Sequence, residues 1–461
     1  MPNIINIEEN NNTKPQAILA GLRTDSRFST NWDKISANPD ILAFPGAETF
    51  NPSGSDFDHS MNEMISLIEA CDMEVPAMIT QTLEHPDNTT YLGKGKANEL
   101  AELAHEFHAE YCIFEGNLSP AQMKNLQEIV GVPVWDRTNL ILEIFSRRAK
   151  TREARLQVES AYLQYMLPRL TGMWQHLGRQ GGGSGSRSNK GIGETQLELD
   201  RRHINHRIAE LSKELEVISR TREVQRQGRK RGEIPSVALV GYTNAGKSSM
   251  MNRLLSLSAA DGNDDKQVFE KDMLFATLDT SIRHIYQENH MDFLLSDTVG
   301  FIENLPHGLV KAFRSTLEEV KYADLLLIVL DSSDPYHRQH RKVTEDTLKE
   351  LEAGDIPRLY VMNKSDLLPD DDSRPIVANE NTIYVSTRTG SGIPELLKAI
   401  TDIVYSGTRT MELLIPYSRG DLLGRLHKNA TVLSEEYVAE GTKVTATCPG
   451  RLADELREFE V

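Results

Sequence analysis

The pattern of apolar and polar positions divides the chain into segments of different periodicity, and the first segment alternates short apolar runs with helical spacing. The apolar runs are 16–22, 75–82, 111–114 and 132–134, and the stretches with helical spacing are 57–70, 97–108 and 121–130. This alternation predicts a small α/β domain over 16–136, after a disordered N-terminus at 1–15. Residues 23–56 are rich in Pro, Asn, Ser and Gly without a sustained period, so we expect an inserted loop there.

The second segment has helical spacing on both sides of a glycine-rich stretch. Residues 140–176 and 194–227 show the helical period, and the letters RQGGGSGSRSNKGIG stand between them at 179–193. Glycine costs about 1 kcal/mol per helical position relative to alanine, so this stretch is predicted to be non-helical. We therefore predict two long antiparallel helices over 137–234, joined by a glycine-rich tip at 178–193.

The third segment again alternates apolar runs with helical stretches. After Pro235, which ends the preceding helix, the apolar runs are 237–240, 293–295, 325–330, 359–362 and 383–385. Continuous apolar runs of this kind predict a mostly parallel, doubly wound α/β sheet over 235–407. The remainder, 408–461, has the pattern strand, helix, strand, strand, helix, which predicts a small α+β domain.

Composition and length restrict the classes of protein to which the chain can belong. The longest apolar run is 325–330, far short of the roughly 20 residues that cross a bilayer, so we expect no membrane association. Cys71, Cys112 and Cys448 have no CxxC spacing, which argues against a disulfide framework or a zinc site. The N-terminus is polar where a signal peptide would be basic and then apolar. We expect a cytoplasmic protein that is monomeric when free.

Charge is unevenly distributed along the chain. The formal net charge is −17, which by itself argues against a nucleic-acid partner. Between positions 201 and 232, however, ten Lys and Arg stand against four Glu, and Arg179, Arg187 and Lys190 occupy the predicted tip without an acidic neighbour. The middle of the chain is therefore locally basic. The alternatives are a solvated basic linker at Arg229, Lys230 and Arg231 and a flexible linker at the glycine-rich tip.

A phosphate-binding pattern, GxxxxGK[ST], occurs at 241–248 as GYTNAGKS, after a predicted strand and before a helical stretch. Backbone N–H groups around Asn244 would surround the β-phosphate, Lys247 would reach the β and γ oxygens, and the Ser248 hydroxyl would ligate Mg2+. An ordinary turn is the alternative. The predicted nucleotide contacts here are Gly241, Tyr242, Thr243, Asn244, Ala245, Gly246, Lys247, Ser248 and Ser249.

A second pattern, DxxG, occurs as Asp297, Thr298, Val299 and Gly300, directly after the apolar run 293–295. A carboxylate at the end of this strand can hold Mg2+ through water, and the Gly300 N–H can meet the γ-phosphate. By itself this short pattern is weak evidence for a nucleotide site. Its position between the other two patterns strengthens the prediction.

A third pattern specifies the base. Asn363, Lys364, Ser365 and Asp366 follow the apolar run 359–362. The Asp366 carboxylate can accept hydrogen bonds from both N1–H and N2–H of guanine, whereas adenine offers no such pair, so the site should prefer guanine by several kcal/mol. A polar turn is the alternative.

Further residues complete or modify the predicted site. Ser386 and Thr387 end the next strand and are expected to support the base through backbone N–H groups. A threonine for Mg2+ and the γ-phosphate is needed between the first two patterns, and spacing leaves both Thr277 and Thr280 open.

Phe301 follows DxxG where many GTPases have a water-orienting Gln. It is either a core aromatic or a sign that other groups polarise the water. Asn244 is the candidate for such a group, through a bound K+ ion in place of an arginine finger.

The arrangement resembles the HflX family of GTPases from about Met61 to the C-terminus. The resemblance is carried by YLGKGKANEL at 91–100, WDRTNLILEIFSRRAKTREARLQVESAYLQYMLPRL at 135–170, GIGETQLELDRR at 191–202, LFATLD at 274–279 and the stretch from DTVGFIENLPHG at 297–308 to position 335. It implies that Thr277 is the switch threonine, with Phe275 and Ala276 beside the nucleotide. The catalytic residues would then be Lys247, Thr277, Gly300 and Asn244.

The resemblance also implies a partner and an activity. The expected partner is the large ribosomal subunit, contacted by the N-terminal domain and by a hairpin tip whose Arg179, Arg187 and Lys190 meet ribosomal RNA. The expected activity is GTP hydrolysis to GDP and phosphate, with Mg2+, coupled to the splitting of stalled or idle ribosomes. Two other functions remain open: a GTP-switched module that binds another protein or an RNA, and an ATP-using RNA remodeller.

Overall fold

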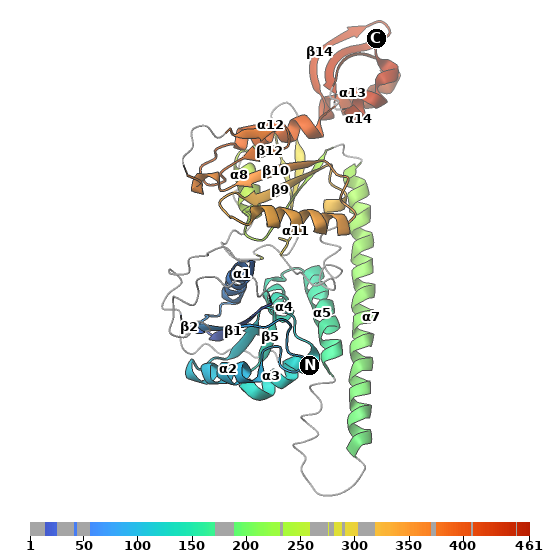
Figure 1. Ribbon diagram of the computed structural model, residues 1–461. Coiled ribbons are helices and arrows are strands. Elements are labelled where there is room, and N and C mark those ends of the chain that lie inside the picture. Colours follow the sequence, from blue (N-terminus) through green and yellow to red (C-terminus); the bar gives the residue numbers. More distant parts are fainter. Residues whose placement is uncertain are drawn as a thin grey trace. The chain divides into compact units, whose positions relative to one another are not determined.

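The computed structural model (Figure 1) describes the greater part of the chain. The described residues are 14–24, 41–43, 56–170, 189–230, 234–258, 275, 281–287, 291–302, 319–369, 375–406, 409–448 and 450–461. They form two compact units: Met1–Arg147 with Val158–Ser212, and Arg148–Gln157 with Lys213–Val461. Of the N-terminus predicted to be disordered, 1–15, residues 1–13 lie outside the described residues.

The first unit contains a sheet of five strands in the order β2-β3-β1-β4-β5. Strands β1 (Ala17–Arg23), β3 (Ala77–Thr82), β4 (Tyr111–Phe114) and β5 (Val134–Asp136) are parallel, and β2 (Ile41–Ala43) is antiparallel to β3. The predicted α/β domain is therefore present. Strand β2 lies inside the segment predicted to be a loop, because three apolar residues are too few to reveal a period.

Three helices connect these strands: α1 (Asp56–Ala70), α2 (Lys94–Glu106) and α3 (Pro120–Val130). Helix α3 begins at a capping box, in which the Ser119 hydroxyl accepts from Gln122 N at 3.2 Å and the Gln122 side chain accepts from Ser119 N at 2.9 Å. It ends at Gly131, whose φ of 80° is the left-handed conformation that favours glycine. One apolar core joins α2 and α3 to the sheet.

The first arm of the predicted hairpin is not one long helix. It consists of α4 (Arg137–Arg148), α5 (Arg152–Met166) and the short 3-10 helix η2 (Leu167–Arg169). The break has a local cause, because Thr151 caps α5: its hydroxyl accepts from Ala154 N at 3.1 Å. Helix α4 buries one apolar face that includes Leu140, Ile144 and Phe145.

The second arm is helix α7 (Asn189–Lys230), which runs antiparallel to α5. Arg207 of α7 forms two hydrogen bonds to the Glu159 carboxylate of α5, at 2.8 and 3.1 Å. The helix begins within the stretch predicted to be non-helical, so Gly191 and Gly193 are helical after all. Two glycines cost a 42-residue helix only about 2 kcal/mol, which its many favourable residues offset.

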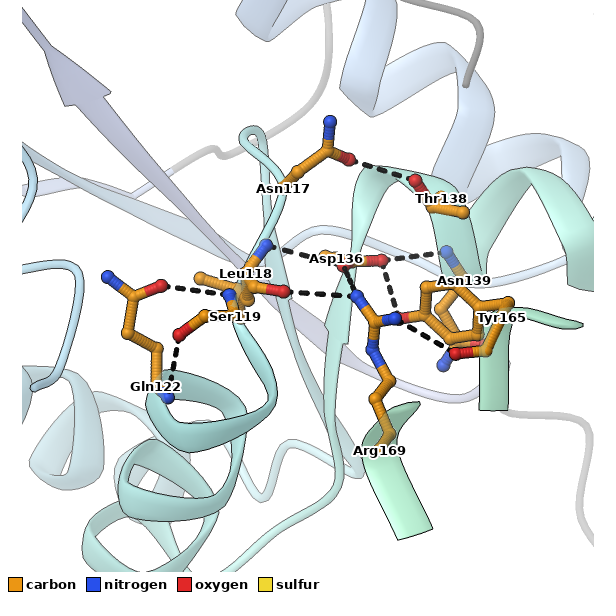
Figure 2. A network of polar contacts seen from close by, with 9 residues as sticks. All are labelled: Asn117, Leu118, Ser119, Gln122, Asp136, Thr138, Asn139, Tyr165 and Arg169. Atoms are coloured by element: carbon orange, nitrogen blue, oxygen red, sulfur yellow. Dashed lines mark hydrogen bonds and ion pairs between the residues drawn. The ribbon is translucent and has the colours of Figure 1, made fainter. Parts of the chain in front are cut away.

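A buried carboxylate links β5 to the first helical arm (Figure 2). Asp136 ends β5 with no exposed surface, and its oxygens accept from Asn139 N at 2.8 Å, the Tyr165 hydroxyl at 2.8 Å and Leu118 N at 3.3 Å. The guanidinium of Arg169 lies 3.2 Å from the same carboxylate and 3.6 Å from the centre of the Tyr165 ring. Burial and the Asp136 charge raise the pKa of Tyr165, which therefore stays a hydrogen-bond donor.

The second unit contains a sheet of seven strands in the order β11-β12-β10-β9-β6-β8-β7. The five central strands are parallel: β6 (Ser236–Gly241), β8 (Phe293–Asp297), β9 (Leu325–Asp331), β10 (Arg358–Asn363) and β12 (Thr382–Tyr384). Strands β7 (Ser281–Ile285) and β11 (Val377–Asn379) add antiparallel edges. Helices α8 (Lys247–Ser256), α11 (His337–Glu350) and α12 (Ile393–Val404) complete the predicted doubly wound fold.

The last segment of the chain has the predicted order of elements. Strands β13 (Arg409–Ile415), β14 (Thr431–Val438) and β15 (Gly441–Cys448) form an antiparallel sheet, with α13 (Gly420–Asn429) after β13 and α14 (Gly450–Glu455) after β15. The α+β prediction is therefore confirmed.

The three cysteines are all described, and all lie inside the protein. Cys71, Cys112 and Cys448 are buried free thiols, and burial raises the pKa of Cys112 to about 12. Within the described part of the chain, every helix is too short or too polar to cross a bilayer.

Candidate nucleotide-binding site

The predicted nucleotide residues follow the carboxyl ends of parallel strands in one sheet. Gly241 ends β6, Asp297 ends β8, Asn363 ends β10, and Ser386 lies just beyond β12. Parallel strands direct their carboxyl ends to one edge, so these motifs share that edge although they are far apart in sequence. The chain leaves β6 for β8 on one side and later returns to β9 on the other, and such a reversal point is where open α/β sheets bind ligands.

The phosphate loop lies between β6 and α8. Asn244 has φ of 60° and Gly246 has φ of 90°, so the backbone turns through two left-handed positions before the helix begins. A Cβ atom at Gly246 would collide with the side-chain nitrogen of Asn363. Glycine is required here for both conformation and space. The left-handed turn supports N–H groups that face one point, as anion binding requires.

Lys247 is the first residue of α8, and its side chain is folded back onto the loop. Its ammonium donates to the carbonyl oxygens of Tyr242 at 2.7 Å and Gly241 at 3.2 Å. Burial lowers the pKa of Lys247 to about 8, and the Asp297 charge opposes this shift. Anionic phosphate oxygens beside the ammonium would favour its charged form further.

Two oxygen groups that suit Mg2+ lie side by side. The Ser248 hydroxyl donates to Oδ2 of Asp297 at 2.9 Å, and the Asp297 side chain has no exposed surface. Mg2+ prefers hydroxyl, carboxylate and phosphate oxygens, so this pair fits the ion. Thr298 fixes the end of β8 by donating its hydroxyl to Leu239 O at 2.7 Å.

The DxxG segment is packed against the phosphate loop. A Cβ atom at Gly300 would lie 2.8 Å from Thr243 Cγ2 and 3.0 Å from Lys247 Nζ, so only glycine permits this approach. Phe301 N donates to Gly241 O at 3.0 Å, and Thr243 N donates to Phe301 O at 2.8 Å. The Phe301 ring is 2% exposed and belongs to the apolar core. Phe301 is therefore a core aromatic, and the interpretation that other groups polarise the water stays a prediction.

The predicted base-binding residues are tied to one another and to the phosphate loop. The Asn363 amide nitrogen donates to Ala245 O at 3.0 Å, and its oxygen accepts from Thr387 N at 3.2 Å. The Asp366 carboxylate accepts from the Ser386 hydroxyl at 2.7 Å. Arg388 lies 3.4 Å from the other Asp366 oxygen, but its side chain is 79% exposed, so this ion pair is weak.

Some predicted residues lie wholly or partly outside the described part of the chain. Ala276, Thr277, Arg179 and Arg187 are outside it, and of Lys190 only the helical backbone is described. Phe275 is buried, with φ of 54°. The roles assigned to these residues, and the contact of Ser386 and Thr387 with the base, stay predictions.

Comparison with known proteins gives matches along the chain. The family model for the GTP-binding GTPase N-terminal region matches residues 58–146, that for the GTP-binding GTPase middle region matches 148–229, and that for the 50S ribosome-binding GTPase matches 236–364. GTPase HflX of Caldanaerobacter subterraneus subsp. tengcongensis is 41% identical over 88% of this chain and 91% of its own. GTPase HflX of Escherichia coli is 40% identical over 83% of this chain and 88% of its own.

This chain belongs to the HflX family of GTPases. The resemblance found in the sequence is thus confirmed, and with it the activity: the chain is an enzyme that hydrolyses GTP. GTPase HflX of Akkermansia muciniphila extends the agreement, with 44% identity over 80% of this chain and 84% of its own.

Sequence reasoning missed one part of this HflX site, the segment between β9 and α11 together with the start of α11. Ser332 donates from its backbone N–H at 2.9 Å and from its hydroxyl at 2.7 Å to the Asn363 carbonyl. The His340 ring stacks on the Tyr242 ring with centroids 3.8 Å apart and planes 9° apart. The letters DSSD directly after the apolar run 325–330 could have indicated this segment, by the same logic that selected Asp297.

Proposed function

We propose that this HflX-family GTPase binds the large ribosomal subunit and uses GTP to promote the splitting of stalled or idle ribosomes. The observation that carries the proposal is the order of the three family matches, which ends in a model described as a 50S ribosome-binding GTPase. The basic helix α7 supports it, because Arg201, Arg202 and Arg220 are exposed and cations are what a phosphate backbone attracts.

Two segments at the same edge of the sheet would bind the nucleotide, one at its phosphates and the other at its base. Lys247 and the phosphate-loop N–H groups would bind the β- and γ-phosphates, and Asp366 would accept from the guanine ring. The Asn363–Ala245 hydrogen bond supports a single site, because it holds the two halves together. Ser248 and Thr277 would ligate Mg2+, Asp297 would hold it through water, and when bound the ion would offset phosphate charge.

The γ-phosphate would act as the switch. The Gly300 N–H and Thr277 would sense it, so that GTP orders the segments around them and hydrolysis releases them. Gly300 supports this role because it already lies against Thr243 and Lys247 of the phosphate loop. The GTP form would favour the ribosome-bound state.

The experiment is co-sedimentation of the full chain with large ribosomal subunits in the presence of a non-hydrolysable GTP analogue. We expect co-sedimentation with the analogue and less with GDP. A variant lacking 179–191 should lose binding, because the tip with Arg179, Arg187 and Lys190 is proposed to contact ribosomal RNA. If the shortened chain sediments as well as the full one, the tip has no such role. Absence of binding by the full chain would contradict the ribosomal partner.

Splitting needs its own measurement. Light scattering of intact ribosomes should fall after addition of the chain with GTP, and should stay constant with GDP. A GTP-dependent partner other than the ribosome would leave the scattering unchanged under both conditions. Turnover of ATP at the rate of GTP would instead favour an ATP-using RNA remodeller.

A further inference from the structure

An ion pair joins the end of β9 to the proposed base-binding segment. The Lys364 ammonium lies 2.7 Å from Oδ2 of Asp331, and the two side chains are 25% and 17% exposed. Strands β9 and β10 are parallel with Asp331 directly beside Asn363, so the register places the carboxylate next to Lys364. Lys364 itself has φ of 59°, a left-handed conformation that turns the chain out of the strand.

The carboxylate is itself held in place. Its other oxygen, Oδ1, accepts from Ser333 N at 3.0 Å and from the Ser333 hydroxyl at 2.6 Å. These contacts fix the Asp331 side chain, so it cannot follow Lys364 through other rotamers. Asp331 is thus a rigid acceptor, and Lys364 is the flexible partner that it orders.

We propose that Asp331 is a positioning residue for guanine-nucleotide binding, acting through Lys364. The inference rests on the proposed nucleotide site, of which Lys364 is a part. A lysine side chain has several rotatable bonds and loses much conformational entropy when it is ordered. Because the ion pair orders the Lys364 side chain beforehand, the nucleotide meets a preformed surface. Less conformational entropy is then lost when the nucleotide binds.

This role predicts a particular kinetic pattern. GDP and GTP carry the same base and ribose, so loss of the ion pair weakens both to the same extent. The hydrolytic step lies at the phosphates, so kcat at saturating GTP is unchanged while KM rises. A residue that only stabilised the fold would alter the melting temperature and leave the affinity of the remaining folded protein unchanged.

The test is a double-mutant cycle with Asp331→Asn and Lys364→Met, measured by GDP titration calorimetry on the full chain. Asparagine keeps an oxygen for Ser333 but loses the charge that holds Lys364. We expect Asp331→Asn to weaken GDP binding about tenfold, which corresponds to about 1.4 kcal/mol. In the Lys364→Met background the same change should have no further effect, since the group it acts through is absent.

Glu345→Gln is the matched control, because it removes another ion pair of this unit, the one with Arg341 at 2.8 Å. It should leave GDP affinity unchanged. The inference would be overturned if Asp331→Asn lowered GDP affinity equally in the unmodified and the Lys364→Met backgrounds, or did not lower it at all. If Asp331→Asn does not fold, Asp331→Glu retains the charge on a longer stem and should give a smaller, still Lys364-dependent loss. Failure of the unmodified chain to bind GDP would instead contradict the proposed site.

Discussion

The side-chain amide of Asn363 donates a hydrogen bond to the carbonyl oxygen of Ala245 at 3.0 Å, joining two motifs that lie 118 residues apart in the chain. The same side chain accepts from Thr387 N at 3.2 Å. Asn363 has no exposed surface, and its bond to Ala245 O is fully buried, whereas the bond from Thr387 N is partly buried. One buried amide therefore ties the phosphate loop, the strand end of β10 and the loop after β12 together.

Replacing this amide should separate the two halves of the site. Asn363→Ala leaves the buried Ala245 carbonyl and the partly buried Thr387 N–H without their partner, at about 1 to 3 kcal/mol. We therefore expect GDP affinity, measured by calorimetry, to fall by about tenfold or more. Asn379→Ala on the exposed edge strand β11 is the control and should bind normally. Unchanged affinity for Asn363→Ala would show that the amide does not organise the site.

Ser248 should determine the response to Mg2+. Ser248→Ala removes the hydroxyl proposed to ligate the ion, so the Mg2+ concentration for half-maximal GTP hydrolysis should rise by about tenfold, the effect of about 1.4 kcal/mol. Ser256→Ala, at the exposed end of α8, is the matched control. Chelation of Mg2+ should stop GTP hydrolysis by the unmodified chain. Full activity in the presence of the chelator would show that hydrolysis does not need Mg2+.

Monovalent cations should affect turnover if Asn244 helps to bind one. The Phe301 side chain has no hydrogen-bonding atom and is buried in the core, so it cannot orient water as a glutamine would. We expect GTP hydrolysis to be faster in KCl than in NaCl at equal ionic strength, and Asn244→Ala to abolish the difference. Equal rates in the two salts would show that catalysis uses no K+ ion.

The buried Asp136 should stabilise the first unit. Asp136→Asn leaves the Arg169 guanidinium without its counter-charge, and breaking a buried pair costs about 3 to 5 kcal/mol. Amide hydrogen exchange in β5 and α4 should become faster, while exchange in β6 and β9 of the second unit stays the same. Glu143→Gln, which breaks the more exposed pair with Arg147 at 2.8 Å, should have little effect. Unaltered exchange in Asp136→Asn would mean that the pair is energetically neutral.

Much of the fold could be predicted from the hydrophobic pattern alone. Strands such as β9 are buried on both faces and read as continuous apolar runs, so the parallel core of each sheet was predictable. The edge strands were not: β7 is half-exposed and contains Arg283 and His284, and β11 is fully exposed. Their position depends on pairing with a neighbour, which periodicity does not record.

The candidate site was predictable only as far as its motifs extend. Phosphate and base chemistry select Lys247, Asp297 and Asp366 by residue type and spacing. Asp331 follows an apolar run as Asp297 does, but its proposed role depends on the parallel register of β9 with β10, which no motif records. His340 belongs to no motif, because its place comes from the stacking of α11 against the phosphate loop. The helix break at Thr151 was missed for a similar reason, since a single capping side chain interrupts an otherwise helical period.

We propose that a phosphate-binding loop and a guanine-selective carboxylate hold one nucleotide at one edge of the second sheet. The most direct test is calorimetric titration of the full chain and of Asp366→Asn with GDP, ADP and xanthosine diphosphate. We predict that the unmodified chain binds GDP more tightly than ADP by several kcal/mol. The variant should bind GDP more weakly and xanthosine diphosphate more tightly, because the asparagine amide can donate to the carbonyl that xanthine has in place of the 2-amino group of guanine. Equal binding of GDP and ADP by the unmodified chain, or unchanged GDP binding by the variant, would contradict the claim.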